Sequence, residues 1–204
     1  MKLFKKEKYP AYLEGDLSLG KQALIFVWEI FKVVVISLAI IIPVRYFLIK
    51  PFYVNGASME PNFHDYEYLI INEISYRFNE PQRGDVVVFR YPFDPSQYFI
   101  KRIVGLPGEK IKIAEGKVYI TNPGHPAGEV LAENYLLPAM KTLGDVEVEL
   151  AADEYYLLGD NRIASLDSRA FGPIKDSYII GKTLLRGWPL DRIGLVTNEL
   201  EYNL

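Results

Sequence analysis

Three short segments of the sequence carry side chains that could together hydrolyse a peptide bond. They are residues 58–61 (SMEP), residues 101–109 (KRIVGLPGE) and residues 159–172 (GDNRIASLDSRAFG). A serine hydroxyl becomes a nucleophile when a base takes its proton, and a lysine amine can be that base in place of histidine. The sequence therefore offers Ser58 as the nucleophile and Lys101 as the general base of an acyl-transfer reaction.

Lys101 can act as a base only while its amine is neutral. At the reference pKa of ~10.4, under roughly 0.1% of a lysine side chain is neutral at pH 7. Burial disfavours the charged form, and strand alternation places Phe99 and Ile103 on the same face as Lys101 while Arg102 faces the other way. We therefore expect an apolar cover that lowers the pKa of Lys101.

The remaining residue types narrow the chemistry. The chain has no cysteine, which excludes a thiol nucleophile, a thiolate zinc site and a disulfide framework. Its two histidines, His64 and His125, are too few for a histidine-rich metal site, and only His64 lies near Ser58 as an alternative base. The formal net charge of -3 gives no reason to expect nucleic acid binding. We therefore expect no cofactor, no metal and no nucleic acid partner.

The N-terminal part of the chain predicts a membrane anchor. Apolar residues dominate residues 23–49, and no charge falls between Lys32 and Arg45. A spanning helix needs about 20 residues, which this stretch supplies if Lys32 extends its amine toward the headgroups. The lysine-rich residues 1–22 then form a cytoplasmic segment, and everything after the anchor faces the outside. A buried amphipathic helix and a cleaved signal peptide are the alternatives.

Short runs of β-forming residues dominate the rest of the chain. Residues 111–113 and 117–120 alternate around Glu115-Gly116, which predicts a hairpin. Residues 121–128 hold two prolines and two glycines and predict a loop. The fold class is therefore mainly β, an antiparallel β barrel or sandwich rather than a parallel α/β sheet. Other predicted strands are residues 66–71, 86–91, 98–104, 146–150 and 178–185.

Each catalytic segment taken alone also fits an ordinary turn or a solvated strand. Together, and in this order behind an apolar N-terminal stretch, they resemble the bacterial type I signal peptidase (leader peptidase) family. The resemblance extends to about residue 189 and includes residues 83–89 (RGDVVVF), which fit a turn and a buried strand. It implies a membrane-bound serine endopeptidase that removes signal peptides from exported preproteins outside the cytoplasmic membrane, after a small-x-small motif.

The resemblance assigns roles to residues at matching positions. Ser58 is the nucleophile, Lys101 is the base, and Ser165 is the serine that hydrogen-bonds and orients the lysine. Other matching residues brace the site by ion pairing: Asp160, Asp167 and Arg169.

The sequence departs from the family pattern at two positions near the nucleophile. Asn62 stands where many members have threonine, and Gly56 stands where some have serine. With glycine at position 56, the oxyanion would be stabilised by backbone N–H groups, chiefly that of Ser58. Candidates for the specificity pocket flank the nucleophile: Phe52, Val54 and Met59.

The resemblance also implies a domain division. Residues 50–115 and 151–204 would form the catalytic β domain, and residues 116–150 a small inserted subdomain. The expected partners are signal peptides and the lipid bilayer of a bacterial cell membrane, and no obligate protein partner is evident. Two alternatives stay open: a conjugation-type Ser-Lys peptidase of the same superfamily, and a non-catalytic, membrane-tethered β domain that binds a partner.

Overall fold

The computed structural model describes residues 18–47, 49–196 and 202–204. The chain forms two compact units, Met1–Val44 and Arg45–Leu204. The basic stretch that predicts the membrane orientation falls within residues 1–17 and thus outside the described residues.

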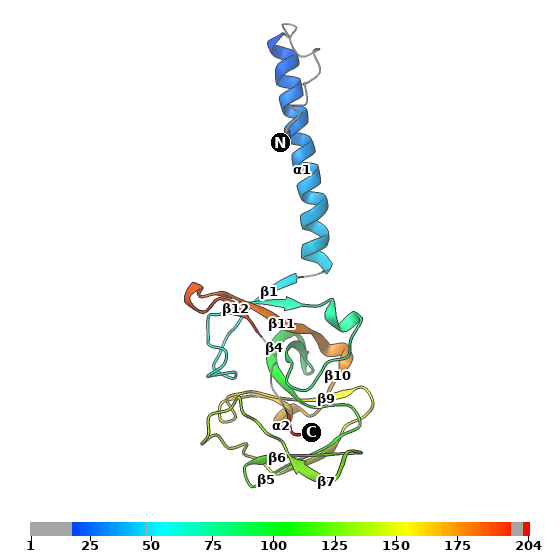
Figure 1. Ribbon diagram of the computed structural model, residues 1–204, viewed down its shortest axis with the longest axis vertical. Helices are drawn as coiled ribbons and strands as arrows, with labels where there is room; N and C mark the ends of the chain where they lie inside the picture. Colours follow the sequence, from blue (N-terminus) through cyan, green and yellow to red (C-terminus); the bar gives the residue numbers. More distant parts are fainter. Residues whose placement is uncertain (1–17, 48, 197–201) are drawn as a thin grey trace, which may run out of the picture. The chain divides into compact units, whose positions relative to one another are not determined.

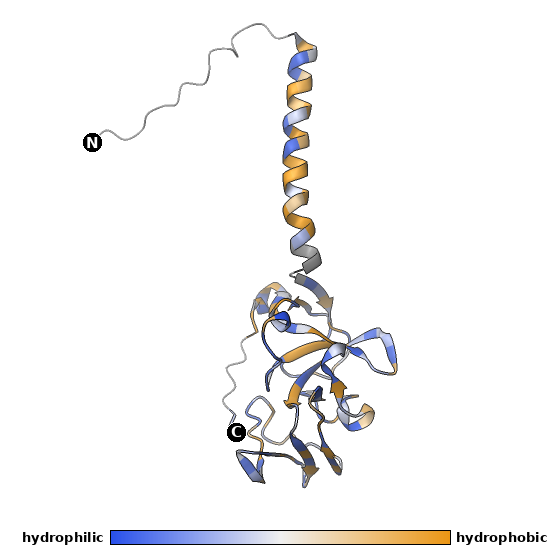
Figure 2. Ribbon diagram, turned by 90° about the vertical axis from the view of Figure 1, so that its right-hand side faces the viewer, coloured by the Kyte–Doolittle hydropathy of each residue, from blue (hydrophilic) through white to orange (hydrophobic). Residues whose placement is uncertain are grey.

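The N-terminal unit is built on the helix α1, Leu19–Phe47. Large apolar side chains are exposed on all its sides, and orange covers most of its length in Figure 2. The stretch Leu19–Pro43 is long and apolar enough to cross a membrane. The helix begins four residues before the predicted anchor, because Ser18 O already accepts hydrogen bonds from Lys21 N (2.8 Å) and Gln22 N (3.2 Å).

The second unit is mainly β, as the sequence predicts (Figure 1). Its larger sheet is antiparallel, with the order β1-β2-β11-β3-β4-β9-β10, and β12 pairs with β11. This path has two ends among the described strands, so the sheet is open and not a closed barrel. The strands are β1 Ile49–Tyr53, β2 Tyr68–Asn72, β3 Val86–Tyr91, β4 Asp94–Gly105, β9 Glu154–Leu158, β10 Ile174–Lys175, β11 Ile179–Trp188 and β12 Gly194–Leu195.

The smaller sheet has the order β7-β6-β5-β8. The predicted hairpin is present, because Glu115 (φ 54°) and Gly116 (φ 79°) both adopt the positive φ that a tight turn requires. The loop predicted for residues 121–128 is wrong: only Pro123-Gly124 turns, and Asn122 Oδ1 accepts a hydrogen bond from His125 N (2.9 Å) as the next strand begins. The strands are β5 Lys110–Ala114, β6 Lys117–Asn122, β7 His125–Val130 and β8 Val146–Glu149.

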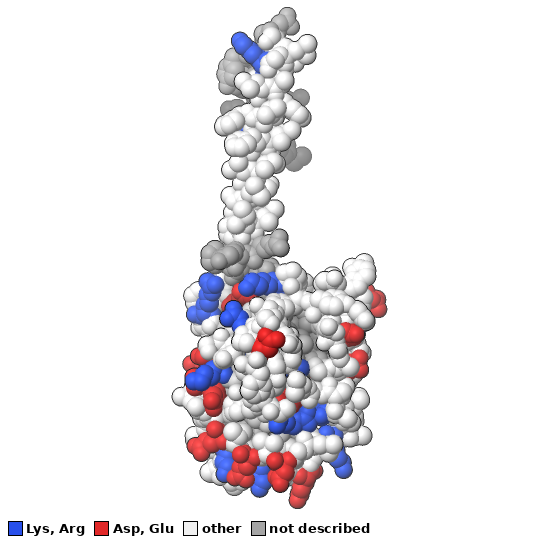
Figure 3. Space-filling model, turned by 180° about the vertical axis from the view of Figure 1, so that it is seen from behind, with Lys and Arg blue, Asp and Glu red and all other residues white. Residues whose placement is uncertain are grey.

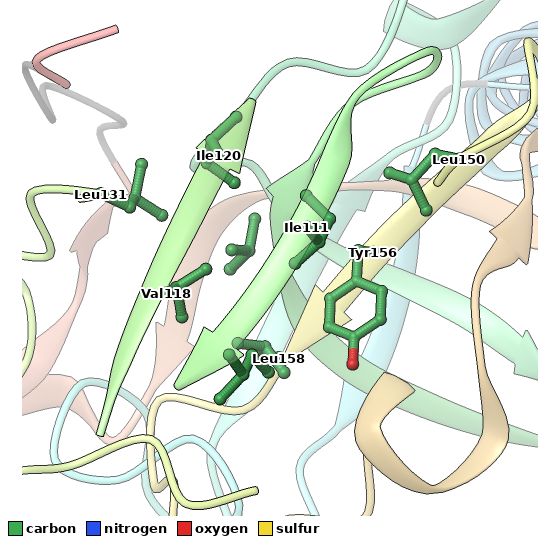
Figure 4. Close-up of a cluster of buried hydrophobic side chains, with 9 residues drawn as sticks. Ile111, Val118, Ile120, Leu131, Leu150, Tyr156 and Leu158 are labelled. Carbon is green, nitrogen blue, oxygen red and sulfur yellow. The ribbon is translucent and has the colours of Figure 1, made fainter. Parts of the chain in front are cut away.

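The smaller sheet begins earlier in the chain than the inserted segment 116–150. The strand β5 pairs with both β6 and β8, so residues 110–114 lie in this sheet and not in the larger one. One hydrophobic cluster covers its inner face, drawn in Figure 4. The cluster is made of Val104, Ile111, Ile113, Val118, Ile120, Leu131, Leu150, Tyr156 and Leu158.

The strand β3 is buried on both faces. It pairs with β4, the strand that carries Lys101, and so holds β4 in place. Val86 and Val88 pack into one cluster with Met59 and Leu69, whereas Val87 and Phe89 pack into another. A continuous apolar run is typical of a strand covered on both sides. The helical elements are short: α2 Ser168–Phe171 and the 3₁₀ turns η2 Ser75–Arg77, η3 Asp176–Tyr178 and η4 Leu190–Arg192. Charged side chains of both signs spread over the surface of this unit (Figure 3).

Candidate active site

Ser58 and Lys101 meet although 43 positions separate them in the chain. Lys101 lies on β4, opposite Val87 of β3, and Ser58 lies in the turn that follows β1. The Lys101 Nζ and Ser58 Oγ atoms are 2.7 Å apart, and Nζ also donates to Ile100 O at 2.8 Å. The nucleophile and the base proposed from the sequence are therefore within hydrogen-bonding distance.

The surroundings of Lys101 favour its neutral form. Only 4% of the residue is exposed, and its Nζ lies 5.6 Å from the centre of the Phe99 ring. Burial lowers the pKa of Lys101 from 10.5 to about 8, while the negative charges of Asp167 and Asp160 act in the opposite direction. Arg102 faces away from this site, as strand alternation predicts, because it pairs with Asp160 instead.

This pKa predicts a stability change that does not depend on any substrate. Protonated Lys101 is disfavoured in the folded state, and the difference between about 8 and 10.5 corresponds to about 3 kcal/mol. Because the unfolded chain binds the proton more tightly, the contribution of Lys101 to the free energy of unfolding should rise by up to that amount as the pH increases from 8 to 10.5. In Lys101→Met this rise should be absent.

Denaturant unfolding followed by circular dichroism at several pH values measures the effect. Lys112 is exposed on β5, so Lys112→Met is the matched control and should keep the rise. An identical pH dependence in the wild type and in Lys101→Met would contradict a lysine that is neutralised by burial.

The turn that carries Ser58 is held from both sides. Met59 is fully buried in the cluster beneath it, and Met59 O accepts a hydrogen bond from Phe63 N (2.9 Å). Gly56 has a φ of 99°, which favours glycine, and its N–H donates to Asp65 Oδ1 (2.9 Å). Among the described residues, the N–H of Ser58 has no acceptor, so it is available to a ligand.

The third sequence segment docks onto the same turn. Asn161 N donates to Ser58 O (3.0 Å), and Asn161 Nδ2 donates to Ala57 O (3.0 Å). Gly159 makes this approach possible, because a Cβ atom there would lie 2.5 Å from Ser58 O and 2.1 Å from Ser165 Oγ. Asn161 is a further residue at the site, and its place inside the GDN motif is the sequence signal that points to it.

Asp160 forms a buried, two-pronged ion pair with Arg102. Its carboxylate accepts from Arg102 Nε (2.8 Å) and Nη2 (2.6 Å), and neither side chain is more than 6% exposed. Asn62 Nδ2 donates to the same carboxylate at 2.8 Å. A paired guanidinium and carboxylate fix each other in position. Arg102 adjoins Lys101, and Asp160 adjoins Asn161, which is bonded to Ser58, so this ion pair links the two segments that meet at the Ser58–Lys101 contact.

Asp167 and Arg169 form the second ion pair that the sequence predicts. Arg169 Nε donates to Asp167 Oδ1 and Arg169 Nη2 to Asp167 Oδ2, both at 2.8 Å. Asp167 also caps α2 through Arg169 N and accepts from Gly159 N at 3.1 Å. Burial alone would raise the pKa of Asp167, but Arg169, the Gly159 N–H and the Ser165 hydroxyl together lower it. Asp167 is therefore held as a carboxylate, and its role in bracing the site stays a prediction.

Ser165 lies at the site but without the contact that the family resemblance implies. Its Oγ is buried and lacks a hydrogen-bond partner among the described residues, although it is close enough to Asp167 to influence that carboxyl group. The amine of Lys101 instead donates to Ser58 and to the carbonyl of Ile100. The assignment of Ser165 as the serine that orients the lysine stays a prediction.

A cavity of about 210 Å³ adjoins the nucleophile. Of the three pocket candidates, Phe52 and Val54 line this cavity, whereas Met59 does not. Met59 points into the core and anchors the turn, so its assignment to the pocket is corrected. Tyr98 and Leu166 line the pocket without having been identified from the sequence. The lining is Phe52, Tyr53, Val54, Asn55, Ser58, Leu69, Val88, Tyr98, Phe99, Ile100, Lys101 and Leu166.

The other candidate base does not reach the site. His64 is half-exposed, and its Nδ1 lies 3.7 Å from Glu60 Oε1. No contact joins it to Ser58 in the part of the chain that the structure describes. Within those same residues, no three acidic or histidine side chains cluster closely enough to hold a metal ion. The geometry thus favours lysine over histidine as the partner of Ser58.

Several proteins that are similar to this chain are signal peptidases. The probable signal peptidase I-2 of Synechocystis sp. is 37% identical over 180 residues, which cover 85% of this chain and 78% of that protein. Signal peptidase I of Bacillus amyloliquefaciens is 34% identical over 165 residues, which cover 76% of this chain and 81% of that protein. A crystal structure of a signal peptidase I from Enterococcus faecalis V583 is 29% identical, with a TM-score of 0.43, over 51% of this chain and 97% of that one.

A profile of the family described as signal peptidase, peptidase S26, matches residues 27–188, from within α1 to the end of β11. This match covers all three catalytic segments and most of the chain. The chain therefore belongs to the signal peptidase family, peptidase S26.

Proposed function

We propose that this protein is a membrane-anchored serine endopeptidase that removes signal peptides from exported preproteins, with Ser58 as nucleophile and Lys101 as general base. The observation that carries the proposal is the 2.7 Å contact between Lys101 Nζ and Ser58 Oγ, at a lysine that is 4% exposed. The alternative of a non-catalytic β domain offers no reason to bury a lysine against a serine at such a cost.

The reaction follows from these two side chains. Neutral Lys101 takes the proton of Ser58 Oγ as that oxygen attacks the scissile carbonyl, and the N–H of Ser58 stabilises the developing oxyanion. The lysine ammonium then gives its proton to the leaving amine, which leaves an acyl-enzyme. Lys101 next takes a proton from water as the water oxygen attacks the ester, and it returns that proton to Ser58 Oγ when the C–O bond of the ester breaks. Asp160 and Asp167 stabilise the ammonium formed in each half-reaction, because their charges raise the pKa of Lys101.

The cavity beside Ser58 supports a preference for small side chains. Its volume is about 210 Å³, and its walls include the aromatic and aliphatic side chains of Phe52, Val54 and Leu166. A pocket of this kind suits compact apolar side chains at the positions before the cleaved bond. We therefore propose cleavage after a small-x-small motif.

The length of the chain supports cleavage near the outer membrane surface. Ser58 follows the end of α1 at Phe47 by eleven residues (58 − 47 = 11), which extend over at most about 40 Å. The lysines of residues 1–22 favour a cytoplasmic N-terminus, so the Arg45–Leu204 unit would lie outside the membrane. A signal peptide that spans the same bilayer would present its cleavage site within this reach.

Incubation of the full chain in detergent with a purified preprotein tests the proposal. We expect one product, shortened at its N-terminus, whose first residue by N-terminal sequencing follows a small-x-small motif. A preprotein with a bulky residue in place of the last small residue is the control and should stay intact. Failure to cut several preproteins would contradict the proposal, and cleavage without regard to that residue would favour the conjugation-type peptidase.

A further inference from the structure

The segment between β7 and β8, residues 131–145, reaches out of the smaller sheet to the GDN motif. Tyr135 Oη donates to Glu133 Oε1 (2.7 Å) and accepts from Arg162 Nη2 (3.0 Å). Arg162 is fully buried, and its Nη1 also donates to Glu133 Oε2 (2.9 Å). Thr142 from the same segment accepts a further hydrogen bond from Arg162. The segment thus supplies the side-chain partners of a buried arginine that follows Asp160 by two positions.

Tyr135 also contacts the ion pair that flanks the catalytic lysine. The guanidinium carbon of Arg102 lies 4.2 Å from the centre of the Tyr135 ring, the arrangement of a cation–π contact. Arg102 directly follows Lys101 on β4 and forms two hydrogen bonds with Asp160. The Tyr135 ring therefore covers the guanidinium and limits where this pair can move.

Asn62 joins Tyr135 to the same carboxylate. Its Nδ2 donates to Asp160 Oδ2 (2.8 Å) and to Tyr135 O (3.0 Å). Both acceptors lack hydrogens, so a side chain that bridges them must donate two hydrogens, which the –NH₂ group of Asn62 can do and a hydroxyl cannot. Asn62 thus ties the main chain of Tyr135 to the Asp160 carboxylate.

Three non-covalent contacts connect Tyr135 to the nucleophile. Arg102 and Asn62 connect Tyr135 to Asp160, and Asn161, the next residue, donates its N–H to Ser58 O at 3.0 Å. A displacement of Asp160 would therefore move the main chain that holds Ser58 against Lys101. A misplacement of about 1 Å between reacting groups can cost about 100-fold in rate.

We propose that Tyr135 is a positioning residue for the Ser58–Lys101 pair. It keeps these two side chains at reacting distance through Arg102, Asn62 and Asp160. The segment 131–145 is then part of the catalytic unit and not a spacer within an insertion. This inference rests on the proposed function, since the relative position of Ser58 and Lys101 matters for activity only if these two residues react.

The test compares Tyr135→Leu and Tyr135→Phe in the full chain, with a preprotein as substrate. Leucine removes the ring over Arg102, so kcat should fall about 10- to 100-fold while KM stays within about twofold, because no substrate contact is lost. Phenylalanine keeps the ring and the main-chain carbonyl, so it should retain most of the activity. Tyr119→Leu makes the same change in β6, away from the network, and should leave kcat unchanged.

A double-mutant cycle with Asp160→Asn shows whether Tyr135 acts through that carboxylate. In the Asp160→Asn background, Tyr135→Leu should lower kcat by much less than in the wild type, because the element it positions is already altered. Multiplicative losses would overturn the inference, and so would a folded Tyr135→Leu protein with wild-type kcat or with only a raised KM. If Tyr135→Leu does not fold, Asn62→Ala, which removes the bridge between Tyr135 and Asp160, should lower kcat with little change in KM, and a wild-type kcat in a folded Asn62→Ala protein would overturn the inference.

These outcomes are separable from failure of the proposed function. If the wild type does not cleave preproteins, the function itself is wrong. If the wild type cleaves them and Ser58→Ala does not, unaltered kinetics in the Tyr135 variants refute the positioning role alone.

Discussion

Lys101→Arg is expected to abolish cleavage at every pH. An arginine side chain stays protonated in proteins, so it cannot take the proton of Ser58 Oγ even though it retains a hydrogen-bond donor near the nucleophile. The loss should reach at least about 10⁴-fold in kcat, the scale seen when the base of a serine protease is removed. The cleavage rate that remains in Lys101→Arg is measured in single-turnover assays, in which the enzyme is in excess over the preprotein.

A second variant separates lost chemistry from lost folding. Lys101→Met fills a similar volume without a charge, so it should be equally inactive while the fold is preserved. His64→Ala removes the other candidate base and should retain wild-type kcat, since His64 contacts Glu60 and not Ser58. Substantial activity in Lys101→Arg, or a large loss in His64→Ala with the fold intact, would contradict the assignment of Lys101 as the base.

Ser58→Ala is expected to have an effect of equal size. Without Oγ no acyl-enzyme can form, and only the contribution of substrate binding and of the backbone N–H remains. The variant should still bind a preprotein, because the cavity walls from Phe52 to Leu166 are unchanged. A single preparation of Ser58→Ala should therefore bind the preprotein as the wild type does but fail to cleave it.

The matched control for this change is Ser177→Ala, an exposed serine in η3. It should cleave at the wild-type rate. Ser58→Ala and Lys101→Met each remove the same proton-transfer step. The kcat of the double variant should therefore be no lower than that of either single variant. A further large loss in the double variant would mean that the two residues act in separate steps.

Strand periodicity explains how much of the site could be predicted from the sequence. Alternation along β4 places Phe99 beside Lys101 and turns Arg102 away, and the structure has this arrangement. The Glu115-Gly116 turn was predictable because a tight hairpin requires positive φ at both central residues. These features depend on local backbone geometry, which a single sequence expresses directly.

Features that depend on contacts between distant segments could not be predicted in this way. The position of Met59 next to Ser58 predicts a pocket residue, but the turn directs its side chain into the core. Tyr135 lies in a stretch without periodicity, and its partners Arg102 and Arg162 are about 30 positions away. Nothing in the local pattern distinguishes such a tyrosine from a loop residue.

The pH dependence of kcat/KM tests most directly whether neutral Lys101 activates Ser58. The measurement uses the full chain in detergent, a peptide that spans a cleavage site, and a pH range from 6 to 10. With the pKa of Lys101 lowered to about 8, roughly a tenth of the enzyme is in the active form at pH 7. We predict that kcat/KM rises with the loss of one proton and reaches half its maximum near pH 8. A flat profile over this range, with chemistry shown to be rate-limiting, would contradict the account.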